Sequence, residues 1–208
     1  MNVYDFDNTV FIPDSSASFL LFCLRHYPRA VLKALPSAAV ETVIYLAQGR
    51  KDAKWLKQAL FSFLNGLDSA EAVVEEFWQC HADQMEAWYL KQLQPDDLII
   101  SASPEFLLRP MADRLGVSLI ATRMDPCSGQ IRGKNCHDEE KARRFLAVYP
   151  ADSIDRFYSD SLSDSPMAAL AREAFLVIDG EFCPWPGKES CVRLKTRCSF
   201  RKRDRQRK

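Results

Sequence analysis

From residue 97 onward, short apolar runs alternate with segments of helical periodicity. The strand-like runs are 99–101, 117–122, 156–159 and 174–178, and the helical segments between them are 103–116, 138–149 and 165–172. Strands that alternate with helices in this way form mainly parallel sheets covered by helices. The alternation therefore predicts an α/β fold with a mainly parallel sheet flanked by helices.

One further strand is expected far from the others in sequence, at Val3–Phe6. About ninety residues of helical pattern separate it from the next strand. We therefore expect an α/β core formed by residues 1–13 and 95–190, with an all-helical insert at 14–94. Within the insert, helices are predicted at 15–26, at 29–48 and along an apolar stripe from Leu56 to Leu64, and a long one runs from an Asp68–Glu71 capping box to about Leu93. In the core, Ser103 is expected to cap a helix that begins at Pro104.

The net charge of zero hides a basic C-terminal end. Residues 193–208 carry nine Lys and Arg against one Asp, which leaves the remainder of the chain near −8. We expect a disordered tail at 191–208 that makes at most weak contact with an anionic membrane, and no specific nucleic-acid binding. No apolar run is long enough to span a membrane, and seven scattered cysteines without a C-x-x-C motif suggest reduced thiols. Together these features suggest a cytoplasmic protein.

The first candidate for chemistry is the stretch Asp5-Phe6-Asp7-Asn8-Thr9. Side chains alternate along a strand, so Asp5 and Asp7 should point to the same side at its carboxyl end, where ligands bind in α/β sheets. Two carboxylates placed together repel each other, and a shared proton or a cation relieves that repulsion. The alternative is a polar strand end whose acids face solvent.

A second acidic pair, Asp160 and Asp164, follows a later strand in a loop rich in serine. If the two strands are neighbours, four carboxylates meet at one sheet edge, and an oxygen-only ligand set suits Mg²⁺. Ser101 ends another strand, where its hydroxyl could bind a phosphoryl oxygen beside the following helix start. A lysine could enter the same cleft from a helix, with Lys141 as the candidate and Lys134 as its competitor.

In this order, the motifs resemble those of the haloacid dehalogenase-like superfamily. The sequences Ile-Ser-Ala-Ser-Pro-Glu-Phe-Leu at 100–107, Gly-Gln-Ile-Arg-Gly-Lys-Asn-Cys at 129–136 and Glu-Glu-Lys at 139–141 are similar to the subfamily that contains phosphoserine phosphatase and phosphatidylglycerophosphatase-like enzymes. The resemblance implies a Rossmann-like α/β core, a helical cap formed by the insert, and a Mg²⁺ cofactor.

The resemblance also implies residue roles. Asp5 would be the nucleophile, Asp7 the general acid and base, and Ser101 and Lys141 would bind the phosphoryl group. The remaining implied contacts are Asn8, Thr9, Asp14 and Ala102 around the phosphate, and Asp5, Asp7, Asp160 and Asp164 around the metal. Asn8, and Ser159 with Ser161, stand where this superfamily commonly has glycine.

The expected function is that of a Mg²⁺-dependent phosphatase that hydrolyses a phosphomonoester through an aspartyl-phosphate. The substrate would be a small phosphorylated metabolite, phosphoserine-like or not, or a phospholipid headgroup. Asp14 stands where phosphoserine phosphatases have glutamate, and only Arg50 is a candidate for their cap arginine. The alternatives are a phosphotransferase or phosphomutase on the same core, and a catalytically silent module that binds lipid or nucleic acid through its tail.

Overall fold

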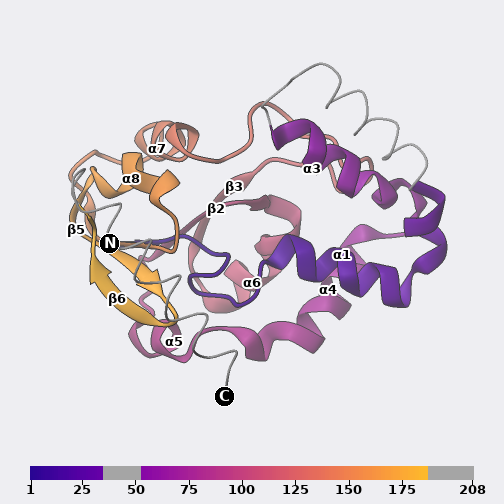
Figure 1. The fold of residues 1–208 in the computed structure, drawn as a ribbon, viewed down its shortest axis with the longest axis horizontal. Coiled ribbons are helices and arrows are strands. Elements are labelled where there is room, and N and C mark those ends of the chain that lie inside the picture. The colour runs from indigo at the N-terminus through magenta and orange to yellow at the C-terminus, as the bar shows by residue number, and fades with distance from the viewer. Residues whose placement is uncertain (35–52, 187–208) are drawn as a thin grey trace, which may run out of the picture.

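The chain folds around one six-stranded sheet (Figure 1). The computed structural model describes residues 1–34 and 53–186. The strands are β1 (Asn2–Tyr4), β2 (Leu98–Pro104), β3 (Ser118–Thr122), β4 (Ile154–Ser159), β5 (Ala171–Ile178) and β6 (Glu181–Pro184). Their order is β3-β2-β1-β4-β5-β6, and β1 to β5 are parallel. The predicted α/β class with a mainly parallel sheet is confirmed.

An edge hairpin that we did not predict completes the sheet. β6 pairs antiparallel to β5 through the two-residue turn Asp179-Gly180. Both turn residues have positive φ, 52° and 79°, as a tight hairpin turn of this kind requires. The Asp-Gly pair was therefore a usable signal for this hairpin.

The strands separate two hydrophobic layers because successive side chains point to opposite faces. Val3, Leu98 and Phe157 share one buried cluster with Phe145 and Met167, which come from the helices α7 (Glu139–Leu146) and α8 (Ser165–Ala168). On the other face, β1, β2 and β4 contribute Tyr4, Ile99 and Tyr158, and the helix α6 (Glu105–Leu115) packs there. The sheet is thus the middle layer of three.

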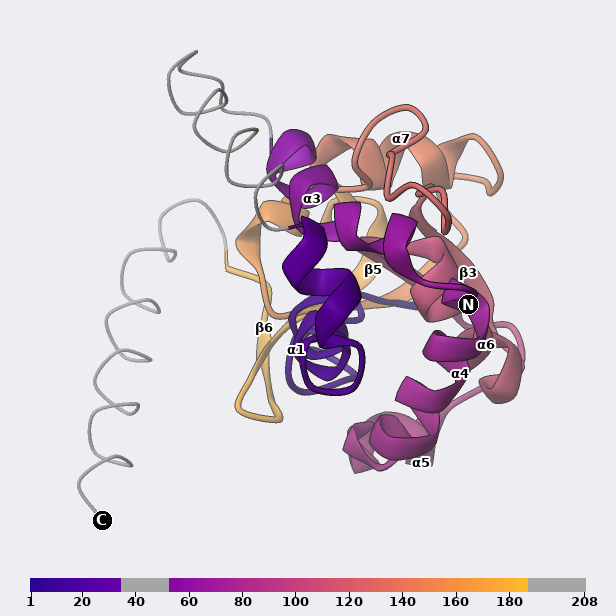
Figure 2. The same ribbon diagram turned by 90° about the vertical axis from the view of Figure 1, so that its right-hand side faces the viewer.

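The helices between β1 and β2 share the second of these hydrophobic clusters. They are α1 (Ser15–His26), α3 (Ala53–Phe61), α4 (Ala70–His81) and α5 (Ala87–Gln92), with short 3₁₀ turns at Ser62–Gly66 and Ala82–Gln84, and residues 28–34 are also helical. We call the described part of 14–94 the helical insert. Figure 2 views the molecule from the side where α1, α3 and α4 lie in front.

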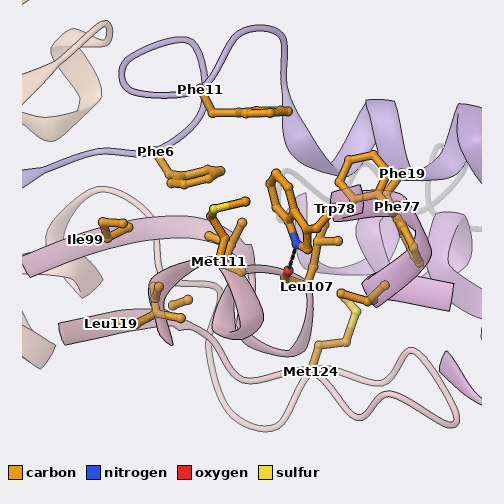
Figure 3. Packing of buried hydrophobic residues seen from close by; sticks show 14 of the residues in the cluster. Phe6, Phe11, Phe19, Phe77, Trp78, Ile99, Leu107, Met111, Leu119 and Met124 are labelled. Atoms are coloured by element: carbon orange, nitrogen blue, oxygen red, sulfur yellow. Dashed lines mark hydrogen bonds between the residues drawn. The ribbon is translucent and has the colours of Figure 1, made fainter. Parts of the chain in front are cut away.

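Trp78 of α4 joins the helical insert to the sheet layer (Figure 3). Its side chain is fully buried, and its ring lies edge-on to Phe6, Phe11 and Phe77. The indole Nε1 donates a 2.7 Å hydrogen bond to the carbonyl oxygen of Leu107 in α6. Because aromatic residues of the 5–11 loop pack on this ring, the insert supports the loop that carries the first acidic motif.

Several predicted helix limits were wrong. Ser69, not Asp68, caps α4, since its hydroxyl accepts the Ala72 amide. The predicted long helix to Leu93 is interrupted, and α4, a 3₁₀ turn and α5 take its place. The chain is extended at Met85, which forms an antiparallel bridge with Phe11, and the Glu86 amide donates to the Val10 carbonyl. The predicted helix at 165–172 ends at Ala168, and the chain enters β5 at Ala171.

Two predictions concern residues that the structure does not describe. The predicted helix at 29–48 is confirmed only to residue 34, and Arg50 lies outside the described residues, as does the predicted basic tail. Among the described residues, no helix has the length and apolar character to cross a lipid bilayer.

Candidate active site

The site lies where the carboxyl ends of three neighbouring strands meet. Asp5 follows β1, Ser101 lies in β2, and Asp160 follows β4, and β1 sits between the other two strands. The Asp5 amide continues the ladder with a 2.8 Å hydrogen bond to the Tyr158 carbonyl. A parallel sheet therefore brings together residues that are 155 positions apart in sequence.

The side chains of the Asp5-Phe6-Asp7 motif point alternately to the site and to the hydrophobic core. Phe6 is fully buried and stacks on Phe11 with 5.6 Å between ring centroids (Figure 3). The turn closes on the Phe6 carbonyl, which accepts the amides of Thr9, Val10 and Phe11. Burial of Phe6 on one side thus directs Asp5 and Asp7 to the other.

A buried ion-pair network surrounds Asp5. The Lys141 ammonium donates to Asp5 Oδ1 at 2.6 Å and to Asp164 Oδ2 at 2.7 Å. The Ser159 hydroxyl donates to the same Asp164 oxygen at 2.8 Å. Lys141, and not Lys134, is therefore the lysine that reaches these acids. Among the described residues, Asp5 Oδ2 receives no hydrogen bond.

Asp7 is held by a second set of donors. Its Oδ2 accepts the Ser103 hydroxyl at 2.6 Å and the Ser101 hydroxyl at 3.3 Å, and its Oδ1 accepts the Ser15 amide at 2.7 Å. Ser103 in turn accepts a hydrogen bond from the Ser15 hydroxyl at 3.1 Å. These contacts fix the Asp7 carboxylate between the end of β2 and the start of α1.

The prediction that Ser103 caps a helix was wrong. The strand β2 continues to Pro104, so α6 begins at Glu105, with no side-chain cap. Ser103 therefore faces the same way as Ser101 and binds Asp7. The two-residue spacing of these serines was the sequence signal for this contact.

The other predicted residues take different places around the acids. The Thr9 hydroxyl accepts the Asp160 amide at 3.0 Å and joins the first motif to the β4 loop. Asn8 is exposed in the turn with φ of 55°, a conformation that asparagine adopts more readily than most residues. Asp14 caps α1 by accepting the Ala17 amide at 2.8 Å, and the Ala102 carbonyl accepts Lys57 of α3 at 2.7 Å.

The site concentrates negative charge. Burial raises the pKa of Asp5, and the Asp164 and Asp7 carboxylates raise it further, while Lys141 opposes the shift. Burial, with Asp164 next, raises the pKa of Asp160 to about 6. Burial disfavours the Lys141 ammonium, but Asp5 and Asp164 outweigh it and raise its pKa. Of these four carboxylates, Asp5 and Asp164 pair directly with the Lys141 ammonium, and among the described residues neither Asp7 nor Asp160 forms an ion pair.

This sequence of motifs matches a known family. The haloacid dehalogenase-like hydrolase family matches residues 3–169. The chain belongs to this family.

Three proteins are similar to this haloacid dehalogenase-like hydrolase in sequence or in fold. It is 29% identical over 194 residues to the protein CicA of Caulobacter vibrioides strain NA1000 / CB15N, and the match covers 82% of each chain. A crystal structure of a protein of unknown function from Bordetella pertussis Tohama I has a TM-score of 0.69 at 19% identity, covering 94% of this chain and 95% of that one. A phospho-aspartyl intermediate analogue of phosphoserine phosphatase has a TM-score of 0.55 at 14% identity, covering 84% of each chain. The two structural matches show a shared fold.

The donors of this haloacid dehalogenase-like site suit a hard cation in their chemistry. In residues 1–34 and 53–186, no three His, Cys, Asp or Glu side chains lie together as a metal cluster. Lys141 stands between Asp5 and Asp164, and Asp7 is turned toward serine hydroxyls. Nevertheless, the acids are all oxygen donors, and burial and mutual repulsion raise the pKa of Asp5 and of Asp160. An excess of buried carboxylate charge of this kind favours binding of Mg²⁺.

Proposed function

We propose that this chain is a Mg²⁺-dependent phosphomonoesterase that forms an aspartyl-phosphate on Asp5. The observation that carries the proposal is the placement of Asp5 and Asp7, with separate sets of donors, at one sheet edge. Membership of a hydrolase family and the fold shared with a phosphoserine phosphatase support it.

In the first half-reaction, Asp5 Oδ2 attacks phosphorus. Lys141 occupies Oδ1 and leaves Oδ2 without a donor among the described residues, so this oxygen is the available nucleophile. The bond between phosphorus and the alcohol oxygen breaks, and Asp7 gives a proton to that oxygen. Serine and amide donors hold Asp7 in place for this transfer.

In the second half-reaction, water replaces the enzyme at phosphorus. Asp7, now a carboxylate, takes a proton from water, and the water oxygen attacks the phosphorus of the aspartyl-phosphate. The bond from Asp5 to phosphorus breaks, which frees inorganic phosphate and regenerates the carboxylate. Ser101 and Lys141 would bind the phosphoryl oxygens, and the Lys141 ammonium would offset their charge.

The cation site would use the acids and one carbonyl. Asp5, Asp160, Asp164 and the carbonyl oxygen of Asp7 would hold Mg²⁺. When bound, the ion supplies positive charge that offsets repulsion between a carboxylate and a phosphate dianion.

Turnover of an aryl phosphate tests the proposal. We expect release of inorganic phosphate in Mg²⁺, loss of turnover in excess chelator, and a loss of about 1,000-fold or more in kcat for Asp5→Asn. Asp179→Asn, which changes an exposed acid in the β5–β6 turn, is the matched control and should keep full activity.

Three results would contradict the proposal. They are turnover that persists in chelator, an active Asp5→Asn variant, and no turnover of any phosphomonoester by the folded protein. Transfer to an added alcohol without release of phosphate in water alone would indicate a phosphotransferase instead.

A further inference from the structure

The insert carries a lysine that the reaction above does not use. Lys57 lies on α3, and its ammonium reaches the core, where it donates to the Ala102 carbonyl at 2.7 Å and weakly to Asn135 Oδ1 at 3.5 Å. Ala102 follows Ser101 directly along β2, so Lys57 enters the same sheet edge as the acids. Lys141 comes to this edge from the core helix α7, whereas Lys57 comes from the insert.

The acceptors of Lys57 are uncharged. Within residues 1–34 and 53–186, no carboxylate oxygen lies within ion-pair distance of its ammonium. Burial lowers the pKa of Lys57, and Asp7 and Asp14 only partly oppose the shift. Those two carboxylates already accept hydrogen bonds from serine donors and from backbone amides. The partly buried cation therefore lacks a direct counterion in this part of the chain.

The position of Lys57 is fixed by its neighbours on α3. Gln58, which is buried, donates to Gln130 Oε1 at 2.8 Å and accepts the Ile131 amide at 3.2 Å. One turn earlier, Lys54 donates to the Gly133 carbonyl at 2.7 Å. Because α3 contacts the 123–138 loop on both sides of Lys57, the position of the Lys57 ammonium next to the core is restricted.

Lys57 reaches the strand segment that holds Asp7, because Ala102 lies between Ser101 and Ser103, whose hydroxyls both donate to that carboxylate. If Asp7 protonates the ester oxygen, the alcohol part of the substrate lies next to Asp7, and Asp14 and Lys57 of the helical insert are charged groups near enough to interact with that carboxylate. An ammonium has three N–H groups. One is used fully by Ala102 and one weakly by Asn135, so a donor remains for a ligand oxygen.

We propose that Lys57 is a specificity residue that binds a second anionic group on the alcohol part of the phosphomonoester. This inference rests on the proposed function, since it assigns the leaving group to the space beside Asp7. The ligand chemistry is an oxyanion close to the ester oxygen, which either a carboxylate or a phosphodiester can supply. Charge-assisted hydrogen bonds of this kind are stronger than neutral ones and discriminate against uncharged analogues.

Three substrates separate the possibilities. Glycerol 3-phosphate has an uncharged alcohol part, 3-phosphoglycerate adds a carboxylate, and glycerol 3-phosphate esterified on its terminal hydroxyl with methyl phosphate adds a phosphodiester. We expect Lys57→Met to lower kcat/KM about tenfold or more for an anionic substrate, mainly through KM, and to change the neutral one by less than about threefold. Lys57→Arg should keep most of the preference, and the anionic substrate that loses more in Lys57→Met identifies the source of the oxyanion.

A matched control and a binding measurement complete the test. Lys91→Met removes an exposed lysine from α5, elsewhere in the helical insert, and should leave the substrate preference unchanged. Calorimetry of the three substrates binding to the Asp5→Asn variant, with and without the Lys57→Met change, measures the preference for an anionic substrate without turnover. Equal losses on all three substrates, or no loss on any, would overturn the inference. A preference in binding that depends on Lys57, without turnover in the parent chain, would sustain the inference while refuting the proposed function.

Discussion

At the scale of single residues, the site depends on side chains with more than one partner. Lys141 joins Asp5 to Asp164, and the Ser103 hydroxyl stands between Asp7 and Ser15. The acids and Lys141 were predictable because strand alternation and the motif order place them at one edge. Ser103 was predicted to be a cap because sequence alone does not reveal that β2 continues to Pro104 before α6 begins.

Ser103→Ala should slow the reaction without preventing substrate binding. The change removes the 2.6 Å hydrogen bond to Asp7 Oδ2, and so the acid loses its shortest positioning contact. We expect kcat to fall about 10- to 100-fold, with KM changed by less than about threefold. Ser18→Ala on α1 is the control. Steady-state kinetics with an aryl phosphate measures both values, and an unchanged kcat would show that this contact does not position Asp7.

Glu140 should contribute to stability in a pH-dependent way. Hydrogen bonds from Arg143, with a smaller contribution from Arg144, lower the pKa of this carboxyl to about 2, although burial opposes the shift. Arg144 also donates to the Ala121 and Lys134 carbonyls, so this pair ties α7 to the end of β3. A group with a lowered folded-state pKa stabilises the fold above its unfolded pKa of about 4.5, and this contribution disappears as pH falls toward 2.

Glu140→Gln tests this linkage. We expect the variant to lose about 1–2 kcal/mol of unfolding free energy at pH 7. The loss is limited to this range because Arg143 is largely exposed, and solvent screens its interaction with Glu140. The difference in unfolding free energy between the parent chain and the variant should decrease steadily as the pH falls from 5 toward 2. Urea unfolding at several pH values measures this difference. Glu139→Gln, at an exposed neighbour, is the control, and a difference that does not change with pH would contradict the assignment.

At the scale of elements, the contact between α3 and the 123–138 loop is one of several close links from the insert to the core. Gly129 has a φ of +70°, and a Cβ there would lie 2.7 Å from the carbonyl carbon of Phe61, at the end of α3. The approach of these two backbones depends on tertiary packing and leaves no local signal in the sequence. For the same reason, we did not predict that Lys57 would lie beside Ala102.

Gly129→Ala should disturb this contact more than an equivalent change elsewhere. Gly116, which follows α6, has the same φ of +70°, but a Cβ there would meet no atom within 4 Å, so Gly116→Ala reports the backbone strain alone. We expect Gly116→Ala to cost about 1 kcal/mol and Gly129→Ala about 1–3 kcal/mol more. Chemical denaturation measures both values, and equal costs would show that the loop moves away from α3 without penalty.

At the scale of the whole molecule, the sheet brings the acidic motifs together, and the insert contacts the same edge through Ser15 and Lys57. Alternation predicted a mainly parallel sheet but not its strand order. The structure places β1 between β2 and β4, which explains why distant motifs meet. The division into core and insert at 13/14 and 94/95 remains a prediction. The structure shows the two parts sharing one hydrophobic cluster, which includes Trp78 of α4 and Leu107 of α6.

The central claim is that Asp5 carries the phosphoryl group during turnover. Acid quenching of the working enzyme, followed by mass spectrometry of its peptides, tests this directly, because an acyl phosphate survives brief exposure to acid. We predict that a peptide containing Asp5 gains the mass of one phosphoryl group in the presence of substrate and Mg²⁺, and that Asp5→Asn gains none. A phosphoryl group on another residue, or rapid turnover with Asp5 never modified, would contradict the account.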